Sequence, residues 1–228
     1  MYLIGLDDTD NLESRGTGHL AREIAGVLAG DYAVLGVTRH QLLLDPRVPS
    51  TKNNSCAAIA LEANGELDPQ VLAERVQSLM LADFQPGSDP GLCVARRVPG
   101  AVVEFGRKAQ RALVSQVEAR SLASAYGITL LGLGGDEDGV IGALAAVGLA
   151  STGHDGRYIH VGHARDLTGM QTVDALLAAG VAAVQTAEGA PVTEGLVLTD
   201  KLRPACRNGR PIAVVEWQGD HWLPLKLD

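Results

Sequence analysis

Residues 1–28 read MYLIGLDDTDNLESRGTGHLAREIAGVL and predict a strand, a polar loop and a helix, in that order. Residues 1–6 are a short apolar run that ends at turn-forming acids, which is typical of a buried strand. Residues 17–28 repeat apolar side chains at helical spacing, with Leu20, Ile24 and Leu28 on one face. The rest of the fold is read outward from this strand, loop and helix.

Similar short segments follow along the chain and favour an α/β fold, with α+β kept open as the alternative. Aromatic residues make up only 4% of the chain, so Val, Leu, Ile and Ala must fill the core, as they do in sheets covered by helices. The pattern predicts further helices over residues 68–80, 104–126, 140–149 and 172–179, of which 104–126 is the longest. It predicts further strands over residues 33–44, 56–62, 92–96, 129–133, 158–161, 196–199, 211–217 and 222–225.

The net charge of −8 argues against a chain that binds nucleic acid by itself, because phosphate backbones are held largely by Lys and Arg. The three cysteines, Cys56, Cys93 and Cys206, fit neither a disulfide framework nor a paired zinc motif, so we expect a cytoplasmic protein. We also expect no secretory leader and no membrane segment, since acids interrupt the first apolar run and no later run is long enough. The sequence indicates no oligomeric state.

Three carboxylates, Asp7, Asp8 and Asp10, lie close together at the end of the first predicted strand. Such acids repel one another unless protons or a cation relieve them. Magnesium is the natural cation, because it takes oxygen ligands and is usually bound by one or two carboxylates together with substrate phosphates. The alternative is a turn whose acids only cap backbone amides. We predict a metal site at Asp7, Asp8 and Asp10, which are also the first candidates for catalysis.

The stretch Arg15-Gly16-Thr17-Gly18 stands just ahead of the first helix, where exposed amides and the helix dipole attract anions. Its glycines allow the backbone to approach a phosphate, and the hydroxyl of Thr17 is a further catalytic candidate. His19 is a possible proton carrier. We therefore predict an ATP or phosphate site at Arg15, Gly16, Thr17 and Gly18. The alternative for this segment is an ordinary helix cap followed by a surface histidine.

Two later segments could add phosphate contacts. Lys52, Asn53 and Asn54 supply one cation and several donors from a long polar loop, which a solvated loop explains equally well. Gly139 and Gly142 begin a small-residue helix that could face an anion, but the acids at residues 136–138 oppose a phosphate there unless they bind metal.

Four motifs together resemble the family of synthetases that attach agmatine to a cytidine in the anticodon of a tRNA-isoleucine. They are Gly5-Leu-Asp-Asp-Thr-Asp10 with Arg15-Gly-Thr17, Leu44-Asp-Pro-Arg-Val-Pro49, Asp89-Pro-Gly91, and Gly139-Val-Ile-Gly-Ala-Leu-Ala-Ala-Val-Gly148. The resemblance covers roughly the first two thirds of the chain.

The resemblance implies an ATP-dependent, kinase-like α/β domain packed with a ferredoxin-like α+β domain. We assign residues 1–60 and 100–165 to the first domain and residues 61–99 and 166–228 to the second. In the family, ATP phosphorylates the cytosine carbonyl oxygen and agmatine then displaces the phosphate. Asp7, Asp8 and Asp10 match the family's metal-binding and phosphate-binding acids, and Thr17 matches its phosphorylated threonine.

The sequence departs from the family at several points. The loop Lys-Thr-Arg-Gly-Asn-Gly-Ala is replaced by residues 51–57, and Asp138 stands where the family has a basic residue. The resemblance does not extend to the oligonucleotide-binding fold and zinc ribbon that grip tRNA in the family, and no Cys-x-x-Cys pair is present.

We therefore expect an enzyme that uses ATP and Mg²⁺ to phosphorylate, and so activate, an oxygen of a small-molecule acceptor, with amine displacement as a possible second step. One alternative is an agmatidine-synthetase-like enzyme that modifies tRNA or a nucleoside with a separate RNA-binding partner chain. The other is a sensor that binds ATP without catalysis.

Overall fold

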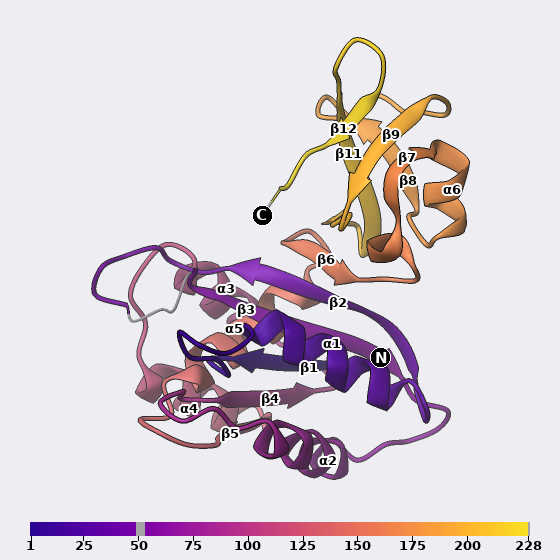
Figure 1. The fold of residues 1–228 in the computed structure, drawn as a ribbon. Coiled ribbons are helices and arrows are strands. Elements are labelled where there is room, and N and C mark those ends of the chain that lie inside the picture. The colour runs from indigo at the N-terminus through magenta and orange to yellow at the C-terminus, as the bar shows by residue number, and fades with distance from the viewer. Residues whose placement is uncertain (49–52, 228) are drawn as a thin grey trace. The chain divides into compact units, whose positions relative to one another are not determined.

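The computed structural model describes residues 1–48 and 53–227 of the chain (Figure 1). The chain divides into two compact units, Met1–Thr152 and Gly153–Asp228. Among the described residues, no helix combines the length and the apolar character needed to cross a bilayer.

The first unit is a five-stranded antiparallel sheet in the order β5-β4-β1-β3-β2, covered by helices. Its strands are β1 Tyr2–Asp7, β2 Ala33–Gln41, β3 Ser55–Glu62, β4 Gly91–Ala95 and β5 Thr129–Gly132. Its helices are α1 Thr17–Leu28, α2 Pro69–Ala82, α3 Gly100–Ala109, α4 Gln116–Ala125 and α5 Gly139–Ser151. The mixture of α and β structure is confirmed, and the antiparallel pairing makes it the α+β form.

Helices cover the two faces of this sheet in separate layers. Helix α1 packs on β1, β2 and β3, and α2 packs on β4 and β5. On the other side α5 packs on the strands, and α3 and α4 pack against α5 (Figure 1). Alternation along β1 assigns its side chains to the faces. Leu3 belongs to the core around α5, and a Cβ at Gly5 would clash with the carbonyl oxygen of Ala143. Asp7 therefore points toward the α5 face as well.

The expectation of one long helix over residues 104–126 is wrong. Helix α3 ends at Ala109, and α4 begins only at Gln116. Ser115 is the N-cap of α4, and its side chain accepts a hydrogen bond from the backbone N–H of Glu118. This serine and glutamate have the spacing of a capping box, which starts a new helix where apolar periodicity alone suggested continuation.

The second unit consists of short strands and one helix. The strands are β6 Arg157–His160, β7 Thr168–Thr172, β8 Ala183–Thr186, β9 Leu196–Asp200, β10 Ala205–Arg207, β11 Arg210–Trp217 and β12 Trp222–Pro224; the helices are α6 Val173–Ala178 and the 3-10 turn η1 Ala164–Asp166. Strand β11 pairs with β8, β10 and β12. Val184 of β8, Val197 of β9 and Val215 of β11 meet Leu176 of α6 in the core. The sequence pattern did not predict β7, β8 and β10.

The two compact units differ from the discontinuous division expected from the resemblance. Residues 61–99 contain α2 and β4, and both belong to the first unit. The reason is strand pairing, because β4 runs antiparallel to β1 from the pair Leu3 with Ala95 to the pair Asp7 with Gly91. The boundary after Thr152 also leaves β6 and η1 in the second unit.

Candidate functional site

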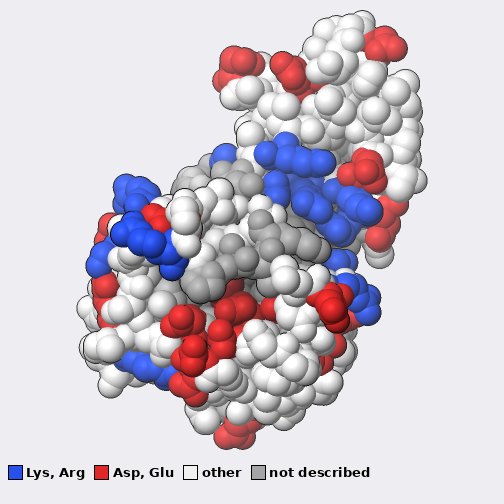
Figure 2. All heavy atoms as spheres, turned by 60° about the vertical axis from the view of Figure 1, so that its left-hand side comes forward, with Lys and Arg blue, Asp and Glu red and all other residues white. Residues whose placement is uncertain are grey.

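A pocket lies at the end of the first unit where β1 finishes. Figure 2 shows Asp and Glu side chains gathered on one part of the surface of this unit. The residues that line the pocket are Asp7, Asp8, Leu42, Leu43, Val48, Asn54, Asp89, Ala109, Ala112, Leu113, Val114, Asp138, Ile141 and Gly142. One part of the wall thus carries four carboxylates and the other part is apolar. We call this the acidic pocket.

Antiparallel pairing brings Asp89 to the end of β1. Because Asp7 lies opposite Gly91, the residues just before β4 adjoin the residues just after β1. Repulsion from the carboxylate of Asp89 is, after burial, the largest cause of the raised pKa of Asp8, so the two acids lie close together. Asp8 also has a φ of 50°, the left-handed region that costs a non-glycine residue roughly 1–2 kcal/mol. The turn after β1 is therefore strained where the carboxylates gather.

Glycines allow α5 to approach the same point. A Cβ at Gly142 would clash with the carboxylate of Asp7, and a Cβ at Gly139 would clash with the carbonyl oxygen of Asp89. The side chain of Asp89 also fixes the turn before α5, since its Oδ1 accepts a hydrogen bond of 2.7 Å from the backbone N–H of Asp136. This turn leads directly to Asp138, the N-cap of α5.

The pocket raises the pKa of two of its carboxyls. Burial, followed by repulsion from Asp8, raises the pKa of Asp7 to about 8. Burial, followed by repulsion from Asp89 and other acids, raises the pKa of Asp8 to about 6. Near neutral pH the site therefore favours protons or a cation over a full set of bare carboxylates.

The donor set suits a hard cation such as Mg²⁺. Among the described residues, the lining of the pocket offers carboxylate oxygens and no His or Cys side chain. Within the same part of the chain, however, no group of three His, Cys, Asp or Glu side chains is arranged to hold a metal by itself. A magnesium ion shared between one or two carboxylates and the phosphates of a nucleotide fits both observations.

Asp10 and Thr17 lie together, but in a helix cap and not in the wall of the acidic pocket. Oδ1 of Asp10 accepts hydrogen bonds from the backbone N–H of Thr17 at 3.2 Å and from its hydroxyl at 3.0 Å. The same hydroxyl accepts a hydrogen bond from the backbone N–H of Thr9, and Thr17 is only 6% exposed. In this conformation the hydroxyl is not open to a ligand. The catalytic and metal roles expected for Thr17 and Asp10 stay predictions.

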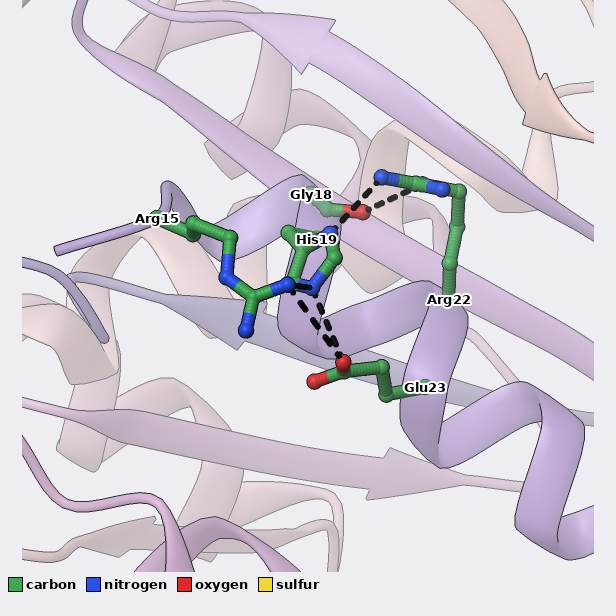
Figure 3. A network of polar contacts seen from close by, with 5 residues as sticks. All are labelled: Arg15, Gly18, His19, Arg22 and Glu23. Atoms are coloured by element: carbon green, nitrogen blue, oxygen red, sulfur yellow. Dashed lines mark hydrogen bonds and ion pairs between the residues drawn. The ribbon is translucent and has the colours of Figure 1, made fainter.

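Arg15 turns along α1 and does not line the pocket. Its Nη1 lies 2.6 Å from Nε2 of His19, and Glu23 lies on the same side of the helix (Figure 3). Gly16 is the exposed N-cap of α1, and the carbonyl oxygen of Gly18 accepts a hydrogen bond from Nε of Arg22.

The remaining phosphate candidates fall in different places. Asn54 lines the pocket, and its Nδ2 donates to the carbonyl oxygen of Leu43. Asn53 is exposed, and Lys52 lies outside the described residues. Gly142 lines the pocket, whereas Gly139 is buried against the backbone before β4. The structure thus brings together Asp7, Asp8, Asn54 and Gly142.

Sequence reasoning missed two acids of the pocket as site residues, Asp89 and Asp138. Asp89 precedes a Pro-Gly pair and a buried strand, and Asp138 precedes the small-residue helix. Both are therefore acids at the ends of elements, the signal that drew attention to Asp7. Only the pairing of β4 with β1 and the packing of α5 show that they face the same pocket.

Comparisons with known proteins agree with the resemblance found in the sequence. No protein-family model matches the chain. The isoleucine-tRNA 2-agmatinylcytidine synthetase TiaS of Cenarchaeum symbiosum is 26% identical over 147 residues, which cover 64% of this chain and 32% of that protein. An uncharacterized protein of Methanocaldococcus jannaschii is 29% identical over 150 residues, or 65% of this chain and 49% of that protein.

Solved structures give the same result. The crystal structure of TiaS in complex with its isoleucine tRNA and ATP has a TM-score of 0.56 and 25% identity, covering 64% of this chain and 36% of that one. The crystal structure of a tRNA fluorescent labeling enzyme also has a TM-score of 0.56 and 25% identity, covering 64% and 35%.

This chain spans between about a third and a half of the length of the curated relatives it matches. Over about two thirds of its own length, it is similar in sequence and in fold to the agmatidine synthetases that act on an isoleucine tRNA.

Proposed function

We propose that the first unit is the catalytic part of an ATP-using enzyme that modifies a nucleobase of RNA, in the manner of the tRNA agmatidine synthetases. The observation that carries this proposal is the acidic pocket, which combines Asp7 and Asp8 with an apolar wall. Support comes from a similar solved structure that is described as a complex with an isoleucine tRNA and ATP.

ATP binds with Mg²⁺ at the carboxylate part of the pocket. Asp7 and Asp8 hold the ion, because their pKa values are raised by burial and by one another, and a cation removes both costs. When bound, magnesium neutralises phosphate charge and orients the transferring phosphoryl group. Because Gly142 has no side chain, the carboxylate of Asp7 can lie against α5. A Cβ at this position would clash with that carboxylate.

The apolar wall receives the flat face of the acceptor. Leu42, Leu113 and Val114 offer a surface without charge opposite the carboxylates. Asp89 and Asp138 stand at the acidic side, where they attract the positive charge of an incoming amine. A carboxylate there can also take the proton that the amine loses when it attacks.

The order of elements supports a ferredoxin-like fold, but for a different part of the chain than the sequence suggested. Residues from β1 to β4 follow the order β-α-β-β-α-β, with the strands arranged as β4-β1-β3-β2. We therefore assign this part of the first unit to the ferredoxin-like class, in place of residues 61–99 and 166–228. The kinase-like assignment of the first unit stays a prediction.

Turnover with defined acceptors tests the proposal. The protein is incubated with ATP, Mg²⁺ and agmatine, with and without bulk tRNA, and both nucleotide products and tRNA nucleosides are resolved. We expect tRNA to stimulate ATP consumption and a modified cytidine to appear, and Asp8→Asn to abolish both. Asp83→Asn, which removes an exposed carboxylate of the same unit, serves as the matched control.

A small-molecule acceptor is the second candidate, and the charge of the chain favours it. The net charge of −8 opposes RNA, and the pocket attracts cations. ATP consumption that is stimulated by amines or nucleosides but not by tRNA would support this candidate against the first. If the protein binds ATP but does not consume it with any acceptor, the result would favour the remaining alternative, a sensor that binds ATP without catalysis.

A further inference from the structure

A cluster of basic side chains lies at the start of α1, just before the helix and in its first turns, outside the acidic pocket. Nη1 of Arg15 lies 2.6 Å from Nε2 of His19, and Nη2 of Arg22 lies 3.0 Å from Nδ1 of the same ring (Figure 3). Oε1 of Glu23 lies 2.8 Å from Nε2 of His19 and 4.0 Å from Nη1 of Arg15. We call Arg15, His19 and Arg22 the α1 basic cluster.

The α1 basic cluster holds more donors than acceptors. A guanidinium group can only donate, and a neutral imidazole accepts at one of its two nitrogens. Both nitrogens of His19 nevertheless face a guanidinium group. Within the part of the chain that the structure describes, the acceptors that the cluster contacts are one oxygen of Glu23 and the carbonyl oxygen of Gly18. An added anion with several oxygens would accept the surplus hydrogen bonds and balance the charge.

The cluster is open and distinct from the acidic pocket. The side chain of Arg15 is 75% exposed and that of Glu23 is 52% exposed. Helix α1 packs on the face of the sheet that α5 does not cover. The acidic pocket, in contrast, is lined in part by residues of α3 and α5. Yet α1 begins at the end of the sheet where β1 finishes, since Asp10 caps Thr17. A ligand can therefore span from the pocket to the cluster across one end of the unit.

We propose that Arg15, His19 and Arg22 bind a backbone phosphate of the RNA strand whose base enters the acidic pocket. This inference rests on the proposed function. An extended strand is long enough to reach an exposed surface outside the pocket that receives its base. The first unit carries more Asp and Glu than Lys and Arg, so a local phosphate contact offsets the repulsion of RNA. Glu23 competes with the phosphate for the same donors.

Binding of a fluorescein-labelled, mixed-sequence, single-stranded RNA oligonucleotide tests the proposal by fluorescence anisotropy at several salt concentrations. We expect the double variant Arg15→Ala/Arg22→Ala to raise Kd about tenfold and to reduce the log-log salt slope by about 0.7, the value for one phosphate of a single strand. Glu23→Gln removes the competing carboxylate and should lower Kd severalfold.

Arg75→Ala/Arg96→Ala is the matched control, because it removes two arginines of the same unit, one half-buried and one exposed, that pair with Asp31 and Glu66. Equal loss of RNA affinity in both double variants would overturn the proposal. A higher Kd for RNA in Glu23→Gln than in the native chain would overturn it as well. ATP binding without RNA is measured on the same variants. Loss of ATP affinity in place of RNA affinity would assign the cluster to the nucleotide. Failure of the native chain to bind ATP would instead count against the proposed function.

Discussion

The substitution Asp7→Asn should stabilise the metal-free protein, increasingly so as pH rises. The carboxyl of Asp7 is enclosed beside Asp8 and Gly142, and its pKa is raised from 3.8 to about 8. Because the folded state keeps this proton better than the unfolded state does, its contribution to stability is complete below about pH 3.8. It is lost as pH rises through the folded pKa.

The magnitude follows from the shift. At about 1.4 kcal/mol per pKa unit, a change from 3.8 to about 8 lowers the free energy of unfolding by on the order of 5 kcal/mol once the group ionises. Asparagine has nearly the same size and carries no charge, so it avoids this loss. The stability gap between Asp7→Asn and the native chain should therefore open above about pH 3.8, reach roughly 1–2 kcal/mol near pH 5 and grow to several kcal/mol at pH 8.

Urea unfolding in EDTA, followed by far-ultraviolet circular dichroism between pH 5 and pH 8, measures this gap. The chain's two tryptophans, Trp217 and Trp222, both lie in the second unit, so their fluorescence reports unfolding of the unit that does not contain Asp7. Asp83→Asn is the exposed control. A gap that stays constant or shrinks as pH rises would refute the reasoning from burial and charge repulsion.

Substitutions at three sites, two of them with a control variant, test the geometry of the first unit. Gly142→Ala should abolish ATP consumption and lower Tm, because its methyl would displace the Asp7 carboxylate. Gly26→Ala is the control, since Gly26 lies in the middle of α1 with open space around it. This control should keep activity and raise the free energy of unfolding in urea by up to about 1 kcal/mol. Ser115→Ala should cost about 1 kcal/mol of unfolding free energy by removing the N-cap of α4; an unchanged urea midpoint would contradict that role. Thr17→Val should cost roughly 1–3 kcal/mol, because the buried hydroxyl partners lose their bonds, and Thr17→Ser should restore most of it. Equal urea midpoints for the valine and serine variants would exclude the cap.

Local periodicity predicted much of the first unit. The helix expected over residues 17–28 has the bounds of α1, and the strands at β1, β3 and β4 lie within a residue or two of expectation. These segments are apolar on a regular period, because each buries one face or both. The elements missed in the second unit are different. Strand β7 is largely exposed, and β10 has only three residues, so neither carries a clear apolar pattern.

A turn signal could have found β10. Asn208-Gly209 separates it from β11, and both residues have positive φ, 52° and 68°. An Asn-Gly pair in that conformation is the preferred two-residue turn of a hairpin. The break between α3 and α4 was likewise marked, by the Ser115 and Glu118 capping pair.

The site was only partly predictable, because its members come from distant parts of the chain. Proximity in sequence grouped Asp7, Asp8 and Asp10, but the structure uses the carboxylate of Asp10 to cap α1. The acids that do join Asp7 and Asp8, Asp89 and Asp138, are brought there by strand pairing and helix packing. A sequence pattern contains no direct record of such contacts.

Isothermal titration calorimetry of ATP in the presence of Mg²⁺ tests the central claim most directly. The native chain should bind ATP saturably, and Asp7→Asn and Asp8→Asn should lose most of that affinity, while Asp83→Asn keeps it. Because Asp7→Asn is expected to be at least as stable as the native chain, its loss of binding could not come from unfolding. Undetectable binding to the native chain, or equal affinity in Asp7→Asn and Asp8→Asn, would contradict the assignment of the acidic pocket to Mg-ATP.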